Sequence, residues 1–157
     1  MAPNERANKV HEVVDTLGVS LPTDLMMTHA LVKDLTEQTM AIGAHTVNHP
    51  ILKQIDADSA RHELADSRDM LQSLTGEPVK LFAYPNGKPG QDYTAVHVKL
   101  LEELGFKAAV STAWGVATVQ SDIYQLPRFT PWDKSPKRFV MRLIQNCLRV
   151  NSERVVC

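Results

Sequence analysis

The sequence has few cysteines, little excess charge and no long apolar run, and each of these absences excludes a class of protein. Only two of the 157 residues are cysteines, Cys147 and Cys157, and both lie near the C-terminus. Such a pair makes neither a disulfide framework nor a cysteine-ligated zinc site. The formal net charge is −1, whereas a protein that binds nucleic acid needs a basic face. We therefore expect no nucleic-acid partner.

The sequence also lacks the apolar stretches that direct a protein into or across a membrane. No run is long enough for a transmembrane segment, and Met1 is followed by polar residues instead of the apolar core of a signal peptide. We therefore expect a cytoplasmic protein without a transmembrane segment. Apolar residues make up 43% and charged residues 22% of the chain, which is ordinary globular usage for a single domain.

Apolar residues recur at two spacings along the chain, one typical of helices and one of buried strands. Helical spacing, with a capping residue before or a glycine after, predicts helices at residues 4–17, from Thr28, at 56–74, at 93–104 and from Ser135. Short apolar runs predict strands at 40–46, 79–84, 106–111 and 124–129. Strands that alternate with helices of this length are typical of parallel βαβ units, so the predicted fold class is α/β.

Two histidines follow the first expected strand and are the first candidates for a functional site. His45 and His49 are four residues apart, and Pro50 comes directly after the second. Because proline disfavours the α conformation in the residue before it, the pair does not fit one regular helix. We expect a strand that opens into a loop, with both imidazoles turned toward one point. Two imidazoles supply half of a tetrahedral zinc shell, although each histidine could instead be a core or capping residue.

Three loops are expected at the same edge of the sheet as the histidines. The histidine loop, the turn-rich loop Pro85–Gly90 and the segment after Val110 each follow an expected parallel strand. Ligands in parallel α/β sheets gather at the C-terminal ends of the strands. We therefore expect the functional site at this edge.

Trp132 is a candidate for contact with a sugar. It lies between Pro131 and Asp133, beyond the fourth expected strand. Aromatic rings pack well on the faces of pyranose rings, and the same apolar area suits them to a buried core. Both roles stay open for Trp132 and for Trp114.

The motifs at these loops resemble those of the polysaccharide deacetylases, carbohydrate esterase family 4. Residues 45–50 read His-Thr-Val-Asn-His-Pro, which is similar to the family's His-Ser/Thr-x-x-His-Pro metal motif. Residues 82–87 read Phe-Ala-Tyr-Pro-Asn-Gly, which resembles a later motif in one branch of the family. The resemblance covers about residues 26–133. It implies an incomplete distorted β/α barrel and metal-dependent removal of acetyl groups from a polysaccharide.

The same resemblance implies roles for individual residues. His45 and His49 would bind a divalent metal, with zinc as the expected ion. Tyr84, Pro85 and Asn86 would take part in binding an acetylated polysaccharide. The family's oxyanion donor, a backbone N–H, aligns with Asn86, and any residue except proline can supply that group.

The chain departs from the family pattern where catalytic groups are expected. It has no Thr-Phe-Asp-Asp-Gly motif, which supplies a metal-ligating Asp and the general base in the family, and no histidine after His97 to act as general acid. The catalytic residues are therefore unknown. Asp56, Asp58 and Asp92 follow strand ends, but helix capping explains them better. Two hypotheses stay open: a deacetylase, active alone or as part of a larger assembly, and an inactive truncated relative that binds metal, glycan or a protein partner.

The expected organisation is one domain over residues 1–157. It has a helical arm at 1–25, a deacetylase-like core at 26–133 and a basic C-terminal helix at 134–157. In the family barrel, the strand before His45 lies beside strands that this sequence lacks. Its apolar edge would then be unprotected, so we expect a homodimer or another partner to cover it.

Overall fold

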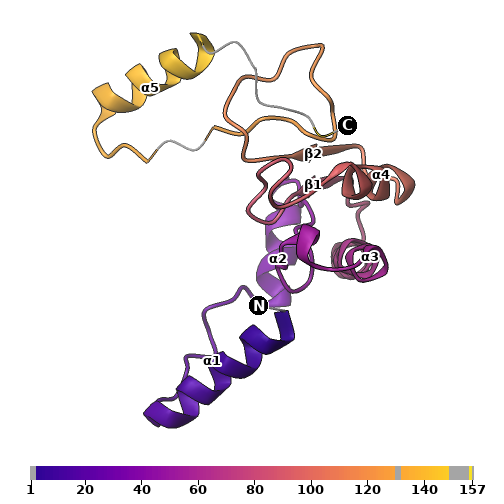
Figure 1. Cartoon of the computed structure of the whole chain (residues 1–157), viewed down its shortest axis with the longest axis vertical. Helices are drawn as coiled ribbons and strands as arrows, with labels where there is room; N and C mark the ends of the chain where they lie inside the picture. The colour runs from indigo at the N-terminus through magenta and orange to yellow at the C-terminus, as the bar shows by residue number, and fades with distance from the viewer. Residues whose placement is uncertain (1–2, 130–131, 149–155, 157) are drawn as a thin grey trace.

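The structure, a computed structural model, describes residues 3–129, 132–148 and 156 (Figure 1). Each helix predicted from apolar spacing is present within these residues. The elements in chain order are α1 (Pro3–Leu17), α2 (His29–Glu37), the short 3-10 helix η1 (Leu52–Gln54), α3 (Ala57–Thr75), β1 (Leu81–Ala83), α4 (Ala95–Glu103), β2 (Ala108–Val110) and α5 (Pro136–Leu148). The fold class is α/β, as predicted.

The capping residues read from the sequence begin and end the helices of the core. The Thr28 hydroxyl accepts a hydrogen bond from the Leu31 N–H at the start of α2 (3.3 Å). The Asp56 carboxylate accepts one from the Ser59 N–H at the start of α3 (2.8 Å), and bonds from Ser59 lower the pKa of Asp56. Gly76 ends α3 with φ 74°, a left-handed conformation that glycine adopts without steric cost.

The sheet is built around one parallel strand pair. β1 and β2 pair with Phe82 opposite Ala109. On the outer side of β1, Ala44 forms a single parallel bridge to Phe82, and on the outer side of β2, Leu126 forms one to Val110. Four extended segments therefore run in parallel, and they lie where the four strands were expected.

The first and fourth of these segments are shorter than the predicted strands at 40–46 and 124–129, which is a correction to the sequence analysis. The Met40 N–H donates to the Leu35 carbonyl and so still belongs to the end of α2. Thr46, with φ 64°, has already left the extended conformation. At the other segment, the Tyr124 and Gln125 N–H groups donate to Asp122 within a turn. Local hydrogen bonds and turns at the ends of these two segments therefore keep them shorter than predicted.

The buried core lies between the strands and the helices α3 and α4, which lie beside them in Figure 1. Ala60 and Leu64 of α3 and Leu101 of α4 are fully buried. The aromatic ring of Phe82 packs edge-on against that of Phe106, with centroids 5.5 Å apart. These residues belong to one buried cluster, to which α3, α4 and β1 all contribute.

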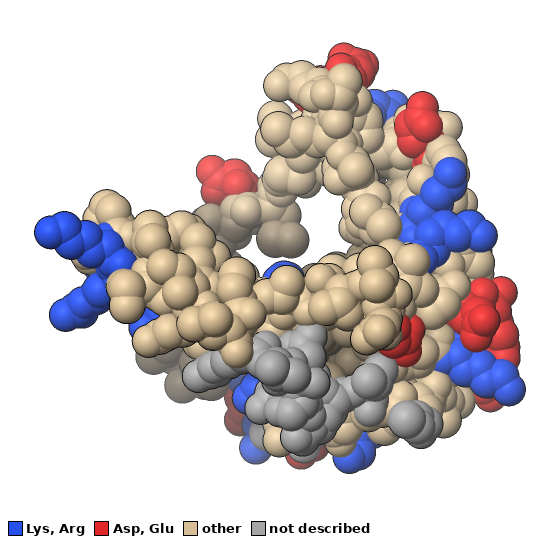
Figure 2. All heavy atoms as spheres, turned by 90° about the horizontal axis from the view of Figure 1, so that it is seen from above, with Lys and Arg blue, Asp and Glu red and all other residues tan. Residues whose placement is uncertain are grey.

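The terminal helices α1 and α5 lie outside this core (Figure 1). The apolar side of α1 is largely exposed, since Val10 and Val13 keep more than half of their surface. α5 joins the rest of the chain through a bond from Asn146 Nδ2 to the Gly115 carbonyl (3.0 Å). Lys and Arg side chains gather at the projecting α5 end of the molecule (Figure 2). Residues 149–155 and Cys157 of the expected basic helix lie outside the described residues.

No helix in the described part of the chain is long and apolar enough to span a membrane. This finding agrees with the absence of long apolar runs in the sequence.

Candidate functional site

His45 and His49 lie together at the C-terminal end of the first extended segment. Their ring centroids are 4.8 Å apart and their planes are inclined by 74°. Both side chains are exposed to solvent. The residues between them form a loop and not a helix, in agreement with the disfavoured helical conformation before a proline. The spacing of the two histidines therefore places their rings side by side, as the sequence analysis expected.

A hydrogen bond to a backbone carbonyl selects the tautomer of His45. Its Nδ1 lies 2.6 Å from the carbonyl oxygen of Ala83, at the end of β1. Because a carbonyl only accepts hydrogen bonds, Nδ1 carries the proton and the lone pair of the neutral ring lies on Nε2. Metal-ligating histidines are usually oriented in this way by a hydrogen bond to the second ring nitrogen. His45 therefore presents Nε2 as its acceptor nitrogen.

The loop between the two histidines has an unusual backbone. Thr46 and His49 have φ values of 64° and 53°, in the left-handed region. For a β-branched residue such as Thr46 this conformation is rare, and it is found where surrounding contacts enforce it. The Thr46 hydroxyl donates to the His45 carbonyl (2.5 Å) and accepts from the His49 N–H (3.1 Å). These bonds tie the two histidines together through their backbone.

The three loops predicted to converge at this edge do so. The His45–Ala83 bond joins the histidine loop to the end of β1. The Thr112 N–H donates to the Gly87 carbonyl (2.8 Å), and the Thr112 hydroxyl donates to the Asn86 carbonyl (2.6 Å). The segment after β2 is thereby joined to the Pro85–Gly90 loop. One edge of the sheet brings together loops from three parts of the sequence.

The residues expected to contact substrate fall into two groups. The side chains of Tyr84 and Pro85 are fully buried, and the Tyr84 hydroxyl donates to the Tyr124 carbonyl (3.0 Å). Burial also raises the pKa of Tyr84. These two side chains therefore present no surface to a ligand, because they point into the core from the strand end. Asn86 and Trp132 are exposed, Trp132 to 84%.

Asn86 has the geometry of a potential backbone donor. It has φ 55°, and within the described residues its N–H makes no hydrogen bond. The following Gly87 packs closely, since a Cβ there would lie 3.0 Å from the Thr112 nitrogen. The turn is therefore held in place by Thr112 while the Asn86 N–H stays available.

Two of the three aspartates considered as further metal ligands, Asp56 and Asp92, have other partners. Asp56 caps α3, as described above, and the Asp92 carboxylate accepts from the Lys88 N–H (2.8 Å) within its own loop. His97 is buried and belongs to the capping box of α4 with Thr94, and burial lowers its pKa. Within the described ranges, no group of three or more His, Cys, Asp or Glu side chains could hold a metal. The histidine pair thus offers two ligands.

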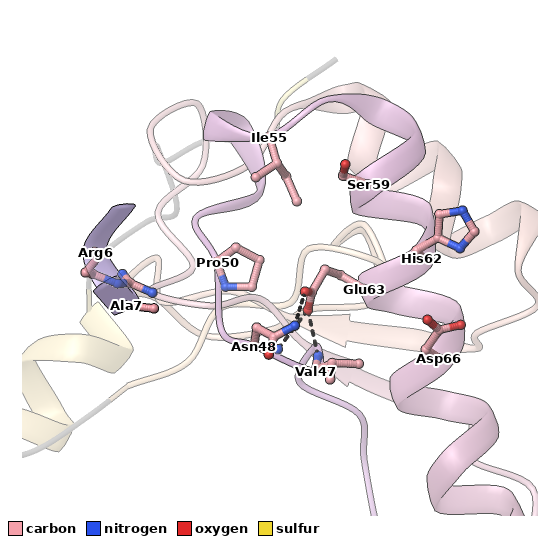
Figure 3. A pocket seen from close by; sticks show the side chains of 10 residues that line it. All are labelled: Arg6, Ala7, Val47, Asn48, Pro50, Ile55, Ser59, His62, Glu63 and Asp66. Atoms are coloured by element: carbon pink, nitrogen blue, oxygen red, sulfur yellow. Dashed lines mark hydrogen bonds between the residues drawn. The ribbon is translucent and has the colours of Figure 1, made fainter. Parts of the chain in front are cut away.

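Glu63 of α3 is the residue at this site that the sequence analysis missed. In the sequence, Glu63 is one of several charged residues of this helix and belongs to no motif. In the structure, Glu63 Oε2 accepts hydrogen bonds from the N–H groups of Val47 and Asn48, each at 2.8 Å. Its Oε1 accepts one from Asn48 Nδ2 at 2.7 Å (Figure 3). No local sequence signal marks this contact, because Glu63 lies fifteen residues or more from its partners.

A cavity of about 590 Å³ lies on the α3 side of the histidine loop (Figure 3). Its lining comes from three parts of the chain: the start of α1, the loop residues Val47, Asn48 and Pro50, and α3 with the residue Ile55 before it. The His62 side chain points away from the loop in this view, whereas the Glu63 side chain points toward it.

Comparison with known proteins gives one consistent result. Residues 8–109 match the sequence profile of a family described as polysaccharide deacetylase. The match begins within the segment 1–25, which carried little of the resemblance in the motifs. The Bacillus subtilis (strain 168) protein YxkH, whose name assigns it to the polysaccharide deacetylases, is 24% identical over 112 residues, which cover 71% of this chain and 39% of YxkH.

Two solved structures are similar in fold. The Streptococcus pyogenes deacetylase PplD, solved in complex with acetate, has 26% sequence identity and a TM-score of 0.69, over 81% of this chain and 53% of PplD. The deacetylase domain of BpsB from Bordetella bronchiseptica has 15% identity and a TM-score of 0.62, over 70% of this chain and 51% of that one. The chain therefore spans 39% to about half of the length of these proteins.

Proposed function

The chain belongs to the polysaccharide deacetylase family, and from this premise we propose that it acts in the metal-dependent removal of acetyl groups from a polysaccharide. The observation that carries the proposal is the pairing of His45 and His49, with His45 Nδ1 bonded to the Ala83 carbonyl. An acetylated polysaccharide is the proposed substrate. Because the chain spans only part of its relatives, these roles are proposed for the part that it supplies.

The donor set fits a divalent transition metal, with zinc proposed. His45 would bind through Nε2, because its Nδ1 proton is held by Ala83, and the adjacent ring of His49 would supply a second nitrogen. Two neutral imidazoles suit zinc and its neighbours better than calcium or magnesium, which prefer oxygen. Such a site needs further ligands, from water or from another part of a larger assembly.

The proposed chemistry is hydrolysis of an acetyl group to acetate and a free amine or hydroxyl. A divalent metal, when bound, polarises a carbonyl and lowers the pKa of a water. This chain's own further contribution would be the Asn86 N–H, which makes no bond among the described residues and could donate to an oxyanion. The general base and general acid stay unassigned.

The fold supports the proposal at a coarse level. Four extended segments run in parallel with the histidines at their C-terminal edge, and this supports the proposal of a partial β/α barrel. We propose that residues 26–133 form such an incomplete barrel, flanked by the arm at 1–25 and the helix from 134. The exposed ring of Trp132 would be suited to stacking on a sugar.

Isothermal titration calorimetry with zinc tests the proposal. The wild-type chain should bind zinc, and the His45→Ala, His49→Ala double variant should lose that binding. His62 is an exposed histidine outside the pair, so His62→Ala is the matched control and should bind as the wild type does. Equal zinc affinity in the wild type and the double variant would refute the proposed site.

A further inference from the structure

We propose that Glu63 is a positioning residue for the histidine pair, and that its carboxylate holds the loop in the conformation that brings His45 and His49 together. The inference rests on the proposed metal-binding function of the two histidines. Glu63 itself is not offered as a metal ligand or as a catalytic group. Its contacts are with the two residues in the middle of the loop, Val47 and Asn48.

Each hydrogen bond to Glu63 places an N–H donor against a carboxylate oxygen. Oε2 accepts from two successive backbone N–H groups, and Oε1 accepts from the Asn48 side-chain amide. An ionised carboxylate only accepts hydrogen bonds, and bonds to an ionised acceptor are stronger than neutral ones. Both oxygens of Glu63 are therefore used by a single short loop.

The loop needs such an external anchor because its own conformation is strained. Thr46 and His49 flank the two anchored residues and both have left-handed φ values. Strained residues persist only where their surroundings over-determine them. Apolar packing contributes little here, since Val47 is 51% exposed. The three hydrogen bonds to Glu63 are the contacts that hold the centre of the loop.

The position of the Glu63 carboxylate is itself fixed by the core. Glu63 lies on α3 beside Leu64 and one turn after Ala60, and both of these residues are fully buried. The Asp56 cap holds the start of the same helix. The side chain of His62, next to Glu63 on α3, points away from the loop (Figure 3). The fold therefore directs one particular carboxylate of this helix to the loop.

Three variants at Glu63 and one control variant at Asp66 test the inference. Glu63→Ala removes the carboxylate, and Glu63→Asp keeps the charge but shortens the side chain by one methylene. Glu63→Gln keeps the length, and its amide can accept from both N–H groups while its NH₂ faces a flipped Asn48 amide. Asp66→Ala is the control, because it removes a charge one turn further along the helix that makes no bond to the loop.

Two measurements report on different parts of the inference. Amide hydrogen exchange of Val47 and Asn48, in protein without metal, reports on the loop alone. Glu63→Ala and Glu63→Asp should lose protection at these two amides, whereas Glu63→Gln and Asp66→Ala should keep it. In zinc calorimetry the first two variants should bind about 10–100-fold more weakly, the usual effect of removing a group that orients a metal ligand.

The outcomes separate this inference from the proposed function. If the wild type binds no zinc, the proposed metal site fails, and the exchange of the two amides still decides the role of Glu63. Wild-type protection and zinc affinity in a folded Glu63→Ala or Glu63→Asp variant would overturn the inference. If Glu63→Ala does not fold, Glu63→Asp gives the decision, because it changes reach without removing charge. Thermal unfolding of each variant is the control: a midpoint equal to that of the wild type shows that a loss of amide protection is confined to the loop.

Discussion

Replacing Gly87 by alanine tests the geometry of the turn that carries Asn86. Gly87 has φ 77°, in a region that costs an L-residue roughly 1–2 kcal/mol. An added Cβ would also lie 3.0 Å from the Thr112 nitrogen and 3.1 Å from the Tyr84 carbonyl oxygen. Both neighbours are backbone atoms, so neither can move aside by changing a rotamer. The substitution therefore combines conformational strain with overpacking.

Gly105 provides a control that separates these two effects. It has φ 81°, and a Cβ there would meet nothing within 4 Å. Gly105→Ala should lower the free energy of unfolding only by the conformational cost of about 1–2 kcal/mol. Gly87→Ala adds an overpacking cost of about 1–3 kcal/mol. Its free energy of unfolding should therefore fall by about 2–5 kcal/mol in total.

Urea unfolding of the two variants measures the difference. Thermal unfolding gives an independent check, since about 1 kcal/mol shifts the midpoint of a chain of this length by roughly 2–4 °C. We expect Gly87→Ala to be clearly less stable than Gly105→Ala. Equal losses in the two variants would refute the close approach of Thr112 to Gly87, and with it the account of how the Asn86 turn is held.

Three other predictions concern activity, pH and assembly. The isolated chain should release little or no acetate from chitin oligomers or acetylxylan, because a general acid and a general base each raise the rate about 10²–10⁴-fold and neither is assigned. Acetate release that a chelator abolishes would contradict this prediction. Asp56→Ala should destabilise the protein at neutral pH. Bonds from Ser59 lower the folded pKa of Asp56 below its ordinary 3.8. The difference in stability between the variant and the wild type should therefore be present above pH 3.8 and disappear as the pH falls through the lower folded pKa. A difference in urea stability that does not change with pH would contradict the cap. In the segment 40–44, Ala44 pairs with β1 on one side, and we propose that a second copy covers the other side of this segment. Light scattering over a dilution series should show a dimer, and a stable 17.5 kDa monomer would exclude it.

Features that depend on neighbours in sequence could be predicted well. The Asp56 cap, the Gly76 end of α3 and the start of α2 at Thr28 each involve residues only a few positions apart. The pairing of His45 with His49 belongs to the same group, because a four-residue spacing before a proline limits how the loop can turn. The alternation of apolar patterns indicated the α/β class for the same reason, since each pattern reports the local period of the backbone.

Features that depend on distant partners were decided only by the tertiary structure. The predicted strand at 40–46 is reduced to one bridge at Ala44, because Met40 still bonds to α2 and Thr46 turns out of the extended conformation toward its loop partners, neither of which apolar periodicity reveals. Tyr84 lies in the core although its motif suggested a substrate contact. Glu63 belongs to no sequence motif and is one of several charged residues of α3. Its role depends on packing that brings α3 against the histidine loop, where two backbone N–H groups that no local residue satisfies meet its carboxylate.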